Sequence, residues 1–326
     1  MAELSSRYIR YLFTQLIIVL VLLVTPFCLL QSHSYRRHVY YLWHPLVDEK
    51  LNARRLNADI LFVGDSSLLM GLEPEVIKQR TGLSAYNLGV PGEAFCMASE
   101  VLLRSYLANN RTPKLVILYM SPQTNCSAVA SRRESAGAYD NIITLSLSHQ
   151  NERLIALLLS HPSYVPLFAL NSWDLMLTNF DSTGWRYNTA VASLRAGGGY
   201  FPNPVNVPLS ACSNSDSGMP LDTKFMRQFQ REHADFGGRF GIYLNPMPDC
   251  DPRYARYKRE AAGVADNILQ RLPHDLFTYD TAHLLPGGAE QNSRSVALFL
   301  SEFIQGRTND GAPFVRKPWT DGATHR

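Results

Sequence analysis

Short apolar segments alternate with helix-like segments, and this alternation constrains the fold more than any other feature of the chain. Residues 59–63, 84–90 and 115–120 are short and apolar, as strands are, and the intervening residues 68–80 and 94–108 have helical patterns. The third strand segment is apolar throughout, which is typical of a parallel strand covered on both faces. The alternation therefore predicts an α/β fold with helices on both sides of a sheet.

The alternation lapses over residues 121–219 and then resumes. The interrupted part carries Gly197-Gly198-Gly199 and several prolines. We interpret it either as an insertion over the carboxyl edge of the sheet, where loops often shape substrate sites, or as a surface excursion without such a role. The later segments are a helix at 222–234, a strand at 240–244, a charged amphipathic helix at 252–272, a short apolar piece at 276–279 and a helix at 289–304.

The N-terminal part of the chain differs from the rest because residues 11–32 contain no charged side chain. A bilayer is crossed by about 20 apolar residues, so this segment is long enough to span one. A cleaved signal peptide is the alternative, but the apolar stretch is long and no small-x-small cleavage site follows it. We expect an uncleaved anchor. Two arginines precede the segment and two follow it, so the charge bias that sets orientation is weak, and we expect the large domain outside.

These features divide the chain into five parts. The expected parts are a short tail at 1–10, a transmembrane anchor at 11–32, a polar helical juxtamembrane connector at 33–57, an α/β domain at 58–305 with the insertion at about 121–219, and a polar tail at 306–326 that we expect to be disordered.

Charge and histidine placement argue against several classes of function. The formal net charge of the 326 residues is only +3, and no run of Lys and Arg is interleaved with aromatic residues, so nucleic acid is not an expected partner. The nine histidines do not cluster. We therefore expect neither a metal nor another cofactor.

Five cysteines are dispersed along the chain without a CxxC motif or metal-type spacing. Cys28 lies in the apolar segment. In an oxidising compartment the other four can form two disulfides, and we expect Cys96 with Cys126 and Cys212 with Cys250. Four unpaired thiols are the alternative.

The first strand leads directly into Gly64-Asp65-Ser66. Gly64 permits a tight turn, so that Ser66 can project from the sheet edge at the start of the next helix. There the Ser66 N–H can help to stabilise an oxyanion. The alternative is that Ser66 or Ser67 only caps the helix.

The second strand ends in a glycine-containing turn at residues 87–92. The N–H of Gly92 can be a second oxyanion donor, because glycine lets the backbone approach a ligand closely. The alternative is a simple turn from strand to helix.

Asp280 and His283 lie three residues apart before the last helix. In a loop this spacing lets Asp280 accept a hydrogen bond from one ring nitrogen of His283, while the other nitrogen faces a serine. The alternative is that Asp280 is a turn residue and His283 is exposed.

Together these elements resemble the SGNH (GDSL-type) hydrolase superfamily. Gly64-Asp65-Ser66 matches its first block, Gly92 the glycine of its second, and Asp280 with His283 its last. The resemblance covers roughly residues 58–125 and 236–305. It implies a three-layer α/β/α, flavodoxin-like domain in which Ser66, His283 and Asp280 are catalytic and the N–H groups of Ser66 and Gly92 form the oxyanion hole.

One block of that family is absent. After the third strand the family usually has Gly-x-Asn-Asp, whose asparagine is a third oxyanion donor, and no residue here matches it. Ser121, Gln123 or Asn125 can substitute, although the resemblance assigns the role to none of them. Loss of one such donor typically costs about a hundred- to a thousandfold in rate.

This departure, the anchor and the insertion are similar to a branch of the superfamily that includes the alginate-acetylation proteins and the D-alanyl-transfer protein of lipoteichoic acid synthesis. The branch implies a single-pass membrane protein with an extracytoplasmic, periplasmic domain. It would transfer or hydrolyse O-acyl groups, O-acetyl above all, on a cell-envelope or secreted polysaccharide, often beside a multi-span membrane acyltransferase. The alternative is a catalytically weak or inactive scaffold or glycan-binding protein in a polysaccharide assembly complex.

Overall fold

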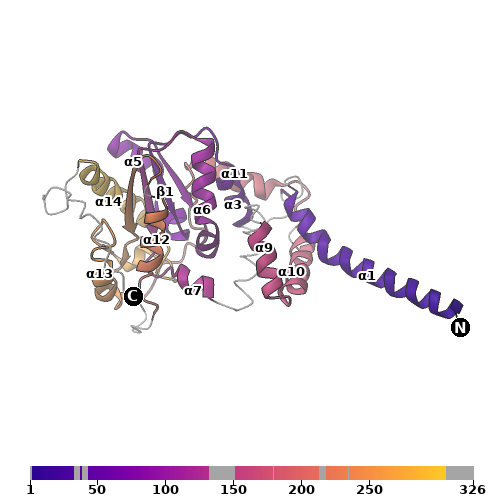
Figure 1. The fold of residues 1–326 in the computed structure, drawn as a ribbon. Coiled ribbons are helices and arrows are strands. Elements are labelled where there is room, and N and C mark those ends of the chain that lie inside the picture. Colours follow the sequence, from indigo (N-terminus) through magenta and orange to yellow (C-terminus); the bar gives the residue numbers. More distant parts are fainter. Residues whose placement is uncertain are drawn as a thin grey trace, which may run out of the picture.

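The computed structural model describes residues 2–32, 37–38, 43–131, 151–178, 180–212, 218–233 and 235–305. Figure 1 shows an α/β body from which one long N-terminal helix projects. The expected tail at 306–326 and most of the segment between residues 32 and 43 lie outside the described residues.

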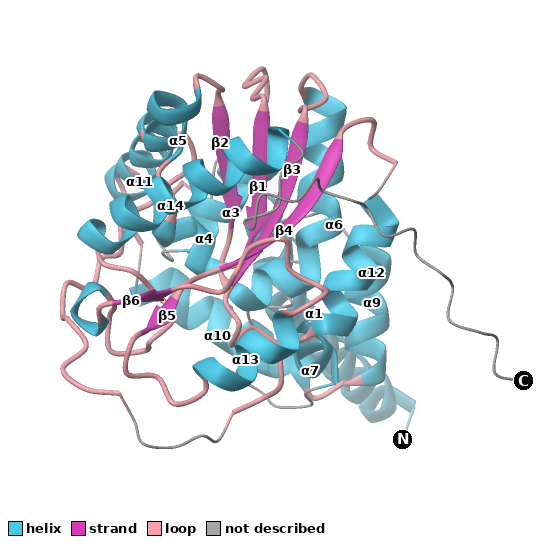
Figure 2. Cartoon of the chain, turned by 90° about the vertical axis from the view of Figure 1, so that its left-hand side faces the viewer, coloured by secondary structure: helices cyan, strands magenta, loops and turns pink. Residues whose placement is uncertain are grey.

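The body is built on a four-stranded parallel sheet in the order β2-β1-β3-β4 (Figure 2). Gly64 at the end of β1 pairs with Gly89 of β2 on one side and with Tyr119 of β3 on the other. The carboxyl ends of the strands therefore meet at one edge of the sheet, as the α/β prediction requires. The strands are β1 (Ile60–Gly64), β2 (Ala85–Gly89), β3 (Leu115–Met120) and β4 (Arg239–Leu244).

Helices cover both faces of this sheet. In β1, Leu61 and Val63 belong to one hydrophobic core, whereas Ile60 and Phe62 belong to another, because successive strand side chains point to opposite faces. All four side chains are fully buried. The first core is covered by α6 (Gly92–Asn109) and α12 (Thr223–His233), and the second by α5 (Pro74–Thr81) and α14 (Pro286–Gln305).

The single helix expected at 68–80 is instead two helices, α4 (Ser66–Gly71) and α5. Glu73 is extended, with φ −96° and ψ 107°, because the ring of Pro74 disfavours helical geometry in the residue before it. The chain restarts as a helix at Pro74, where a missing N–H costs nothing.

The long helix expected at 252–272 is also wrong, since α13 spans only Tyr254–Ala261. The chain turns at Gly263, which has a positive φ of 84°. Beyond it, Asp266 Oδ2 accepts from the Ile242 N–H at 2.7 Å and Asn267 Oδ1 from the Leu244 N–H at 2.8 Å. These side chains accept hydrogen bonds from the N–H groups on the outer edge of β4, which would otherwise be unpaired. A continuous helix over the same residues would not place them there. A small parallel pair follows, β5 (Met247–Pro248) with β6 (Arg271–Leu272), and then a 3-10 turn, η1 (His274–Leu276).

The segment expected to be a polar connector contains α3 (Trp43–Leu51), which packs into the body. Leu46 and Lys50 are fully buried. The Lys50 ammonium donates to the backbone oxygens of Asn87 at 2.8 Å and Gly199 at 2.7 Å, and burial lowers the pKa of Lys50 well below its ordinary value. A polar side chain that binds buried acceptors has the same hydropathy as one that faces solvent. The sequence therefore did not predict the burial of this helix.

The remaining helices belong to the N-terminus and to the 121–219 segment. The window Arg7–Thr25 of α1 is long and apolar enough to cross a membrane, and none of it is buried. In Figure 1 α9 and α10 lie between the body and α1, and α11 packs against α3. These helices are α1 (Ala2–Gln31), α7 (Cys126–Ser131), α9 (Asn151–Ser160), α10 (Tyr164–Thr178) and α11 (Trp185–Ala196).

Both expected disulfides are present. Cys96 in α6 is bonded to Cys126 in α7, and Cys212 is bonded to Cys250. Cys28 is free and exposed. The alternative of four unpaired thiols is therefore wrong.

Candidate active site

Ser66 is the first residue of α4 at the carboxyl edge of the sheet. A Cβ on Gly64 would lie 1.8 Å from the Tyr119 carbonyl oxygen, so only glycine fits where the chain leaves β1. Asp65 is the N-cap of α4, because its carboxylate accepts from the Ser67 N–H at 2.9 Å. The alternative that a serine caps this helix is wrong, and the Ser66 hydroxyl is left for another partner.

The Asp65 carboxylate joins the ends of two strands. It is buried, with 1% of its surface exposed. Oδ1 accepts from the Ser67 hydroxyl at 2.5 Å, and Oδ2 accepts from the Ser121 N–H at 3.0 Å and from the Thr124 hydroxyl. The turn that presents Ser66 is thereby held to the end of β3. Sequence reasoning noted Asp65 only as part of a motif and missed this role.

The structure brings Ser66, His283 and Asp280 together through two consecutive hydrogen bonds. The Ser66 Oγ lies 2.7 Å from His283 Nε2, across 217 residues of sequence. The other ring nitrogen, Nδ1, bonds to Asp280 Oδ2. Because a carboxylate can only accept, Nδ1 carries the proton, and Nε2 is then free to accept from the serine hydroxyl.

The second oxygen of Asp280 shapes its loop. Oδ1 accepts from the Thr278 hydroxyl at 2.9 Å and from the N–H groups of Ala282 and His283, both at 3.0 Å. Burial raises the pKa of Asp280, but hydrogen bonds and the charge of His283 outweigh it and lower the pKa to about 2. Asp280 is therefore both the expected turn residue and the partner of His283. The histidine side chain is only 22% exposed, so the alternative of an exposed His283 is wrong.

Thr281, which lies between Asp280 and His283, is held in an unusual backbone conformation by two side chains. Thr281 has φ of 61°, in the left-handed region that a β-branched residue rarely adopts. Its hydroxyl accepts from Gln123 Nε2 at 2.9 Å and from Arg253 Nη2 at 3.3 Å. The strained turn is thus held from two separate elements of the fold.

Asn245 holds the same loop from beneath. Its Nδ2 donates to the Ala282 carbonyl at 3.0 Å, and its Oδ1 accepts from the Tyr119 hydroxyl at 2.5 Å. Asn292 Nδ2 donates in turn to the Tyr119 oxygen at 2.7 Å. Sequence reasoning missed this buried chain. The signal available was Asn245-Pro246 at the end of a strand, where the position suits a residue that faces the site.

The two expected oxyanion donors lie at the starts of the helices that follow the paired strands β1 and β2. The N–H groups of Ser66 and Gly92 lie in the first turns of α4 and α6. The N–H groups of a first helical turn have no acceptor within the helix. The Val90 N–H donates to the Gly64 carbonyl at 3.1 Å, so the turn that leads to Gly92 lies beside the turn that leads to Ser66. A Cβ on Gly92 would meet nothing within 4 Å, so a side chain at this position has room.

The three candidates for a third donor are already engaged. The Ser121 N–H donates to Asp65, and the Asn125 Nδ2 donates to the Pro220 carbonyl at 3.4 Å, while its Oδ1 caps α7 by accepting from the Ala128 N–H at 2.7 Å. Gln123 Nε2 is directed to Thr281. Of the three, Gln123 alone has a side chain that bonds to the loop that carries Asp280 and His283.

The 121–219 segment has two different surroundings. Its later part borders the site, since the Phe201 N–H donates to Leu69 of α4 at 3.0 Å and the Leu209 N–H to Phe277 at 2.8 Å. Its earlier part, α9 and α10, extends toward α1 (Figure 1). The interpretation as a site-shaping insertion therefore fits the later part of the segment. The interpretation as a surface excursion fits the earlier part, α9 and α10.

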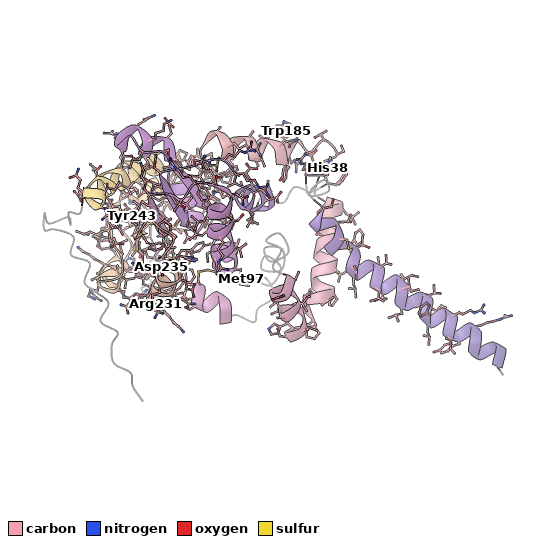
Figure 3. The ribbon with its side chains drawn as sticks, turned by 45° about the horizontal axis from the view of Figure 1, so that its top comes forward. His38, Met97, Trp185, Arg231, Asp235 and Tyr243 are labelled. Carbon is pink, nitrogen blue, oxygen red and sulfur yellow. A yellow bond between two sulfur atoms is a disulfide. The ribbon has the colours of Figure 1, made fainter. Side chains whose placement is uncertain are left out.

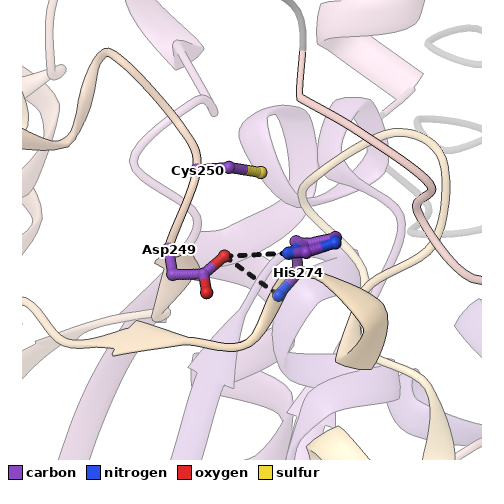
Figure 4. A group of neighbouring side chains, drawn as sticks. All are labelled: Asp249, Cys250 and His274. Atoms are coloured by element: carbon purple, nitrogen blue, oxygen red, sulfur yellow. Dashed lines mark hydrogen bonds and ion pairs between the residues drawn. The ribbon is translucent and has the colours of Figure 1, made fainter.

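A second cluster of potential ligand atoms consists of Asp249, Cys250 and His274, whose ligand atoms lie within 4.8 Å of one another (Figure 4). The sulfur of Cys250 is bonded to Cys212 and cannot act as a thiolate ligand. One carboxylate and one imidazole remain, about half exposed, which is too few ligands for a structural metal site.

No family model, curated protein or solved structure matches this chain.

Proposed function

We propose that this chain is a membrane-anchored SGNH-type serine acyltransferase or carboxylic ester hydrolase. The main support for the proposal is the pair of hydrogen bonds that joins the Ser66 hydroxyl to His283 and His283 to Asp280. A serine needs such a base and such an orienting acid to act as a nucleophile. The strand order β2-β1-β3-β4 agrees with the first four strands of a flavodoxin-like sheet, in which sites lie at the carboxyl edge.

The chemistry follows from the hydrogen bonds. Ser66 Oγ attacks an acyl carbonyl carbon while its proton passes to His283 Nε2. The N–H groups of Ser66 and Gly92 bind the oxyanion that forms. His283 then gives the proton to the leaving alcohol, and Asp280 stabilises the imidazolium in the meantime. The acyl-enzyme passes its acyl group to a sugar hydroxyl in a transferase, or to water in an esterase.

The proposed substrate is an O-acyl, above all O-acetyl, group of a cell-envelope or secreted polysaccharide. Three features support this setting: the resemblance to anchored SGNH proteins, the apolar helix α1, and two disulfides, which persist in oxidising compartments. The domain would lie outside the cytoplasm, in the periplasm, where a multi-span membrane acyltransferase could supply acyl groups.

A second candidate function is a catalytically weak scaffold or glycan-binding protein on the same fold. The engagement of Ser121, Gln123 and Asn125 with other partners favours it, because the third oxyanion donor is then missing. Against it, a scaffold needs none of the hydrogen bonds that join Ser66, His283 and Asp280.

Labelling with a fluorophosphonate and turnover of p-nitrophenyl acetate by the full-length chain separate the two functions. We expect labelling and turnover in the wild type, and loss of both in Ser66→Ala and His283→Ala. Two matched controls are Ser67→Ala, a buried neighbour whose hydroxyl donates to Asp65, and His274→Ala, the histidine of the exposed pair. Both controls should retain labelling.

A folded wild type that neither labels nor turns over would favour the scaffold. If Ser67→Ala abolishes labelling and Ser66→Ala does not, the assignment of the nucleophile is wrong. N-terminal sequencing of the mature protein tests the anchor against a cleaved signal peptide. Transfer to polysaccharide in competition with water then decides between transferase and esterase.

A further inference from the structure

Ser66 and His283 belong to segments that lie far apart in the sequence, so the bond between them depends on what holds the two segments together. Ser66 is the first residue and Gly71 the last of the short helix α4. A helix of six residues is about 9 Å long and forms a single unit, so a contact at its end also fixes its start. The end of α4 lies against the residue after His283, because a Cβ on Gly71 would lie 3.3 Å from Leu284 Cδ1.

A chain of buried hydrogen bonds runs from the end of α4 to the loop that carries the histidine. Asn292 Nδ2, in α14, donates to the Gly71 carbonyl and to the Tyr119 oxygen, both at 2.7 Å. The Tyr119 hydroxyl donates to Asn245 Oδ1 at 2.5 Å, and Asn245 Nδ2 donates to the Ala282 carbonyl at 3.0 Å. Tyr119 is the middle member of the chain, and its hydroxyl both accepts and donates. The last residue of α4 is thereby joined to the residue that precedes the histidine.

The burial of these side chains keeps the hydrogen bonds in place. Tyr119 and Asn292 are fully buried, and Asn245 is 1% exposed. A buried donor or acceptor that loses its partner is costly, because water cannot replace the partner. Burial also raises the pKa of Tyr119 well above its ordinary value, so the hydroxyl keeps the proton that it donates. The hydrogen bonds therefore fix the distance between α4 and the loop.

Tyr243 provides a comparison within the same core (Figure 3). It pairs with Tyr119 in the register of β3 and β4, and the two rings are stacked with their centroids 5.3 Å apart. Both side chains are fully buried. Within the described part of the chain, however, the Tyr243 hydroxyl makes none of the hydrogen bonds that join α4 to the loop. The two tyrosines therefore share their packing and differ in what their hydroxyls hold.

We propose that the Tyr119 hydroxyl is a positioning group that keeps the Ser66 hydroxyl within hydrogen-bond distance of the His283 ring. It acts through Asn292 on α4 and through Asn245 on the loop, and it takes no part in the chemical step. This role rests on the proposed function, because it concerns the same proton transfer from serine to histidine. A small shift between a nucleophile and its base slows the chemical step. Loss of the hydroxyl should therefore lower kcat and leave KM nearly unchanged.

Tyr119→Phe in the full-length chain removes the hydroxyl and keeps the ring, and Tyr243→Phe is the matched control. Steady-state kinetics with p-nitrophenyl acetate give kcat and KM, while near-UV circular dichroism and thermal unfolding report on folding. We expect Tyr119→Phe to lower kcat by about ten- to a hundredfold, with KM nearly unchanged. The rate of fluorophosphonate labelling at Ser66 should fall with kcat. Tyr243→Phe should leave kcat, KM and the labelling rate nearly unchanged.

Asn245→Ala breaks the same chain of hydrogen bonds at the loop, and it tests the proposal if Tyr119→Phe does not fold. It should lower kcat in the same way. The double variant should lose little more kcat than the more affected single variant, because both changes break one connection.

Two results would overturn the role of Tyr119 alone. The first is a folded Tyr119→Phe with the kcat of the wild type, or with a loss that Tyr243→Phe shares. The second is a double variant in which the losses of kcat multiply, because the two side chains would then act separately. A wild type that neither labels nor turns over would instead contradict the proposed function, and the role of Tyr119 would fall with it.

Discussion

The chain contains two aspartate–histidine pairs, and their difference shows what makes such a pair a candidate for catalysis. Asp249 accepts from His274 Nδ1 at 3.1 Å and from the His274 N–H at 3.2 Å (Figure 4). Asp280 accepts from the same two groups of His283. Residue types and local hydrogen bonds are therefore alike in the two pairs.

The surroundings of the two pairs are not alike. His274 and Asp249 are 41% and 50% exposed, whereas His283 and Asp280 are 22% and 33% exposed. Only His283 has a serine hydroxyl on its second nitrogen. A pair in water gains little from its charge interaction, whereas a half-buried pair with a third partner can direct a proton. The third partner and the burial, and not the pair itself, therefore define the candidate site.

The largest expected difference between the pairs is the effect of removing each carboxylate. Asp280→Asn should lower kcat for p-nitrophenyl acetate by about 10⁴-fold, because an amide no longer selects the tautomer of His283 that accepts the serine proton. Asp249→Asn should leave kcat within a factor of two or so of the wild type, as expected for an exposed pair. Steady-state kinetics on both variants, with circular dichroism as the control for folding, make the test. Equal losses of kcat in the two variants would show that the Asp280 pair has no catalytic role that the Asp249 pair lacks.

The next effect tests whether backbone donors accompany only the Ser66 pair. Gly92→Pro removes the N–H at the first position of α6, where proline is tolerated, and Pro91 already has the extended ψ of 145° that a following proline requires. We expect a loss of about a hundred- to a thousandfold in kcat. Gly92→Ala keeps the N–H and should lose far less. Similar losses in the two variants would mean that the space near Gly92 matters and its N–H does not.

Gln123→Ala separates a positioning role from an oxyanion role. If Gln123 only holds Thr281, one hydrogen bond of about 1 kcal/mol is lost and kcat should fall by about fivefold. A loss of about a hundredfold or more would identify Gln123 as the third oxyanion donor. We expect the smaller loss, with KM for p-nitrophenyl acetate nearly unchanged. Gln228→Ala is the matched control, because the exposed Gln228 side chain donates to an exposed neighbour, Glu232, at 2.8 Å.

The smallest expected effect is on stability at acid pH. The pKa of Asp280 is lowered from 3.8 to about 2, so its ionisation stabilises the folded state above pH 3.8. This contribution should be lost as the pH falls from about 4 to about 2, and Asp280→Asn should lack that part of the pH dependence. Urea midpoints between pH 2 and pH 6 for both proteins provide the measurement. If the urea midpoints of the two proteins change with pH in parallel, the ionisation of Asp280 does not cause the loss of stability at acid pH.

The amino-acid sequence alone predicts the strands of this protein and the contact within one loop. The apolar segments predicted β1, β2, β3 and β4 to within about a residue, because strand burial is written in short-range periodicity. The same holds for the apolar character of α1. The spacing of Asp280 and His283 predicted their contact, since three residues in a loop bring the two side chains together.

Contacts between distant segments were visible only in the folded structure. It placed Ser66 on His283, made Asp65 the cap that ties β1 to β3, and ended α13 early. It also buried α3 and laid α10 against α1. These outcomes depend on which buried polar groups find partners and which apolar faces find cover. Both are properties of packing between elements, and periodicity within one segment carries no information about them.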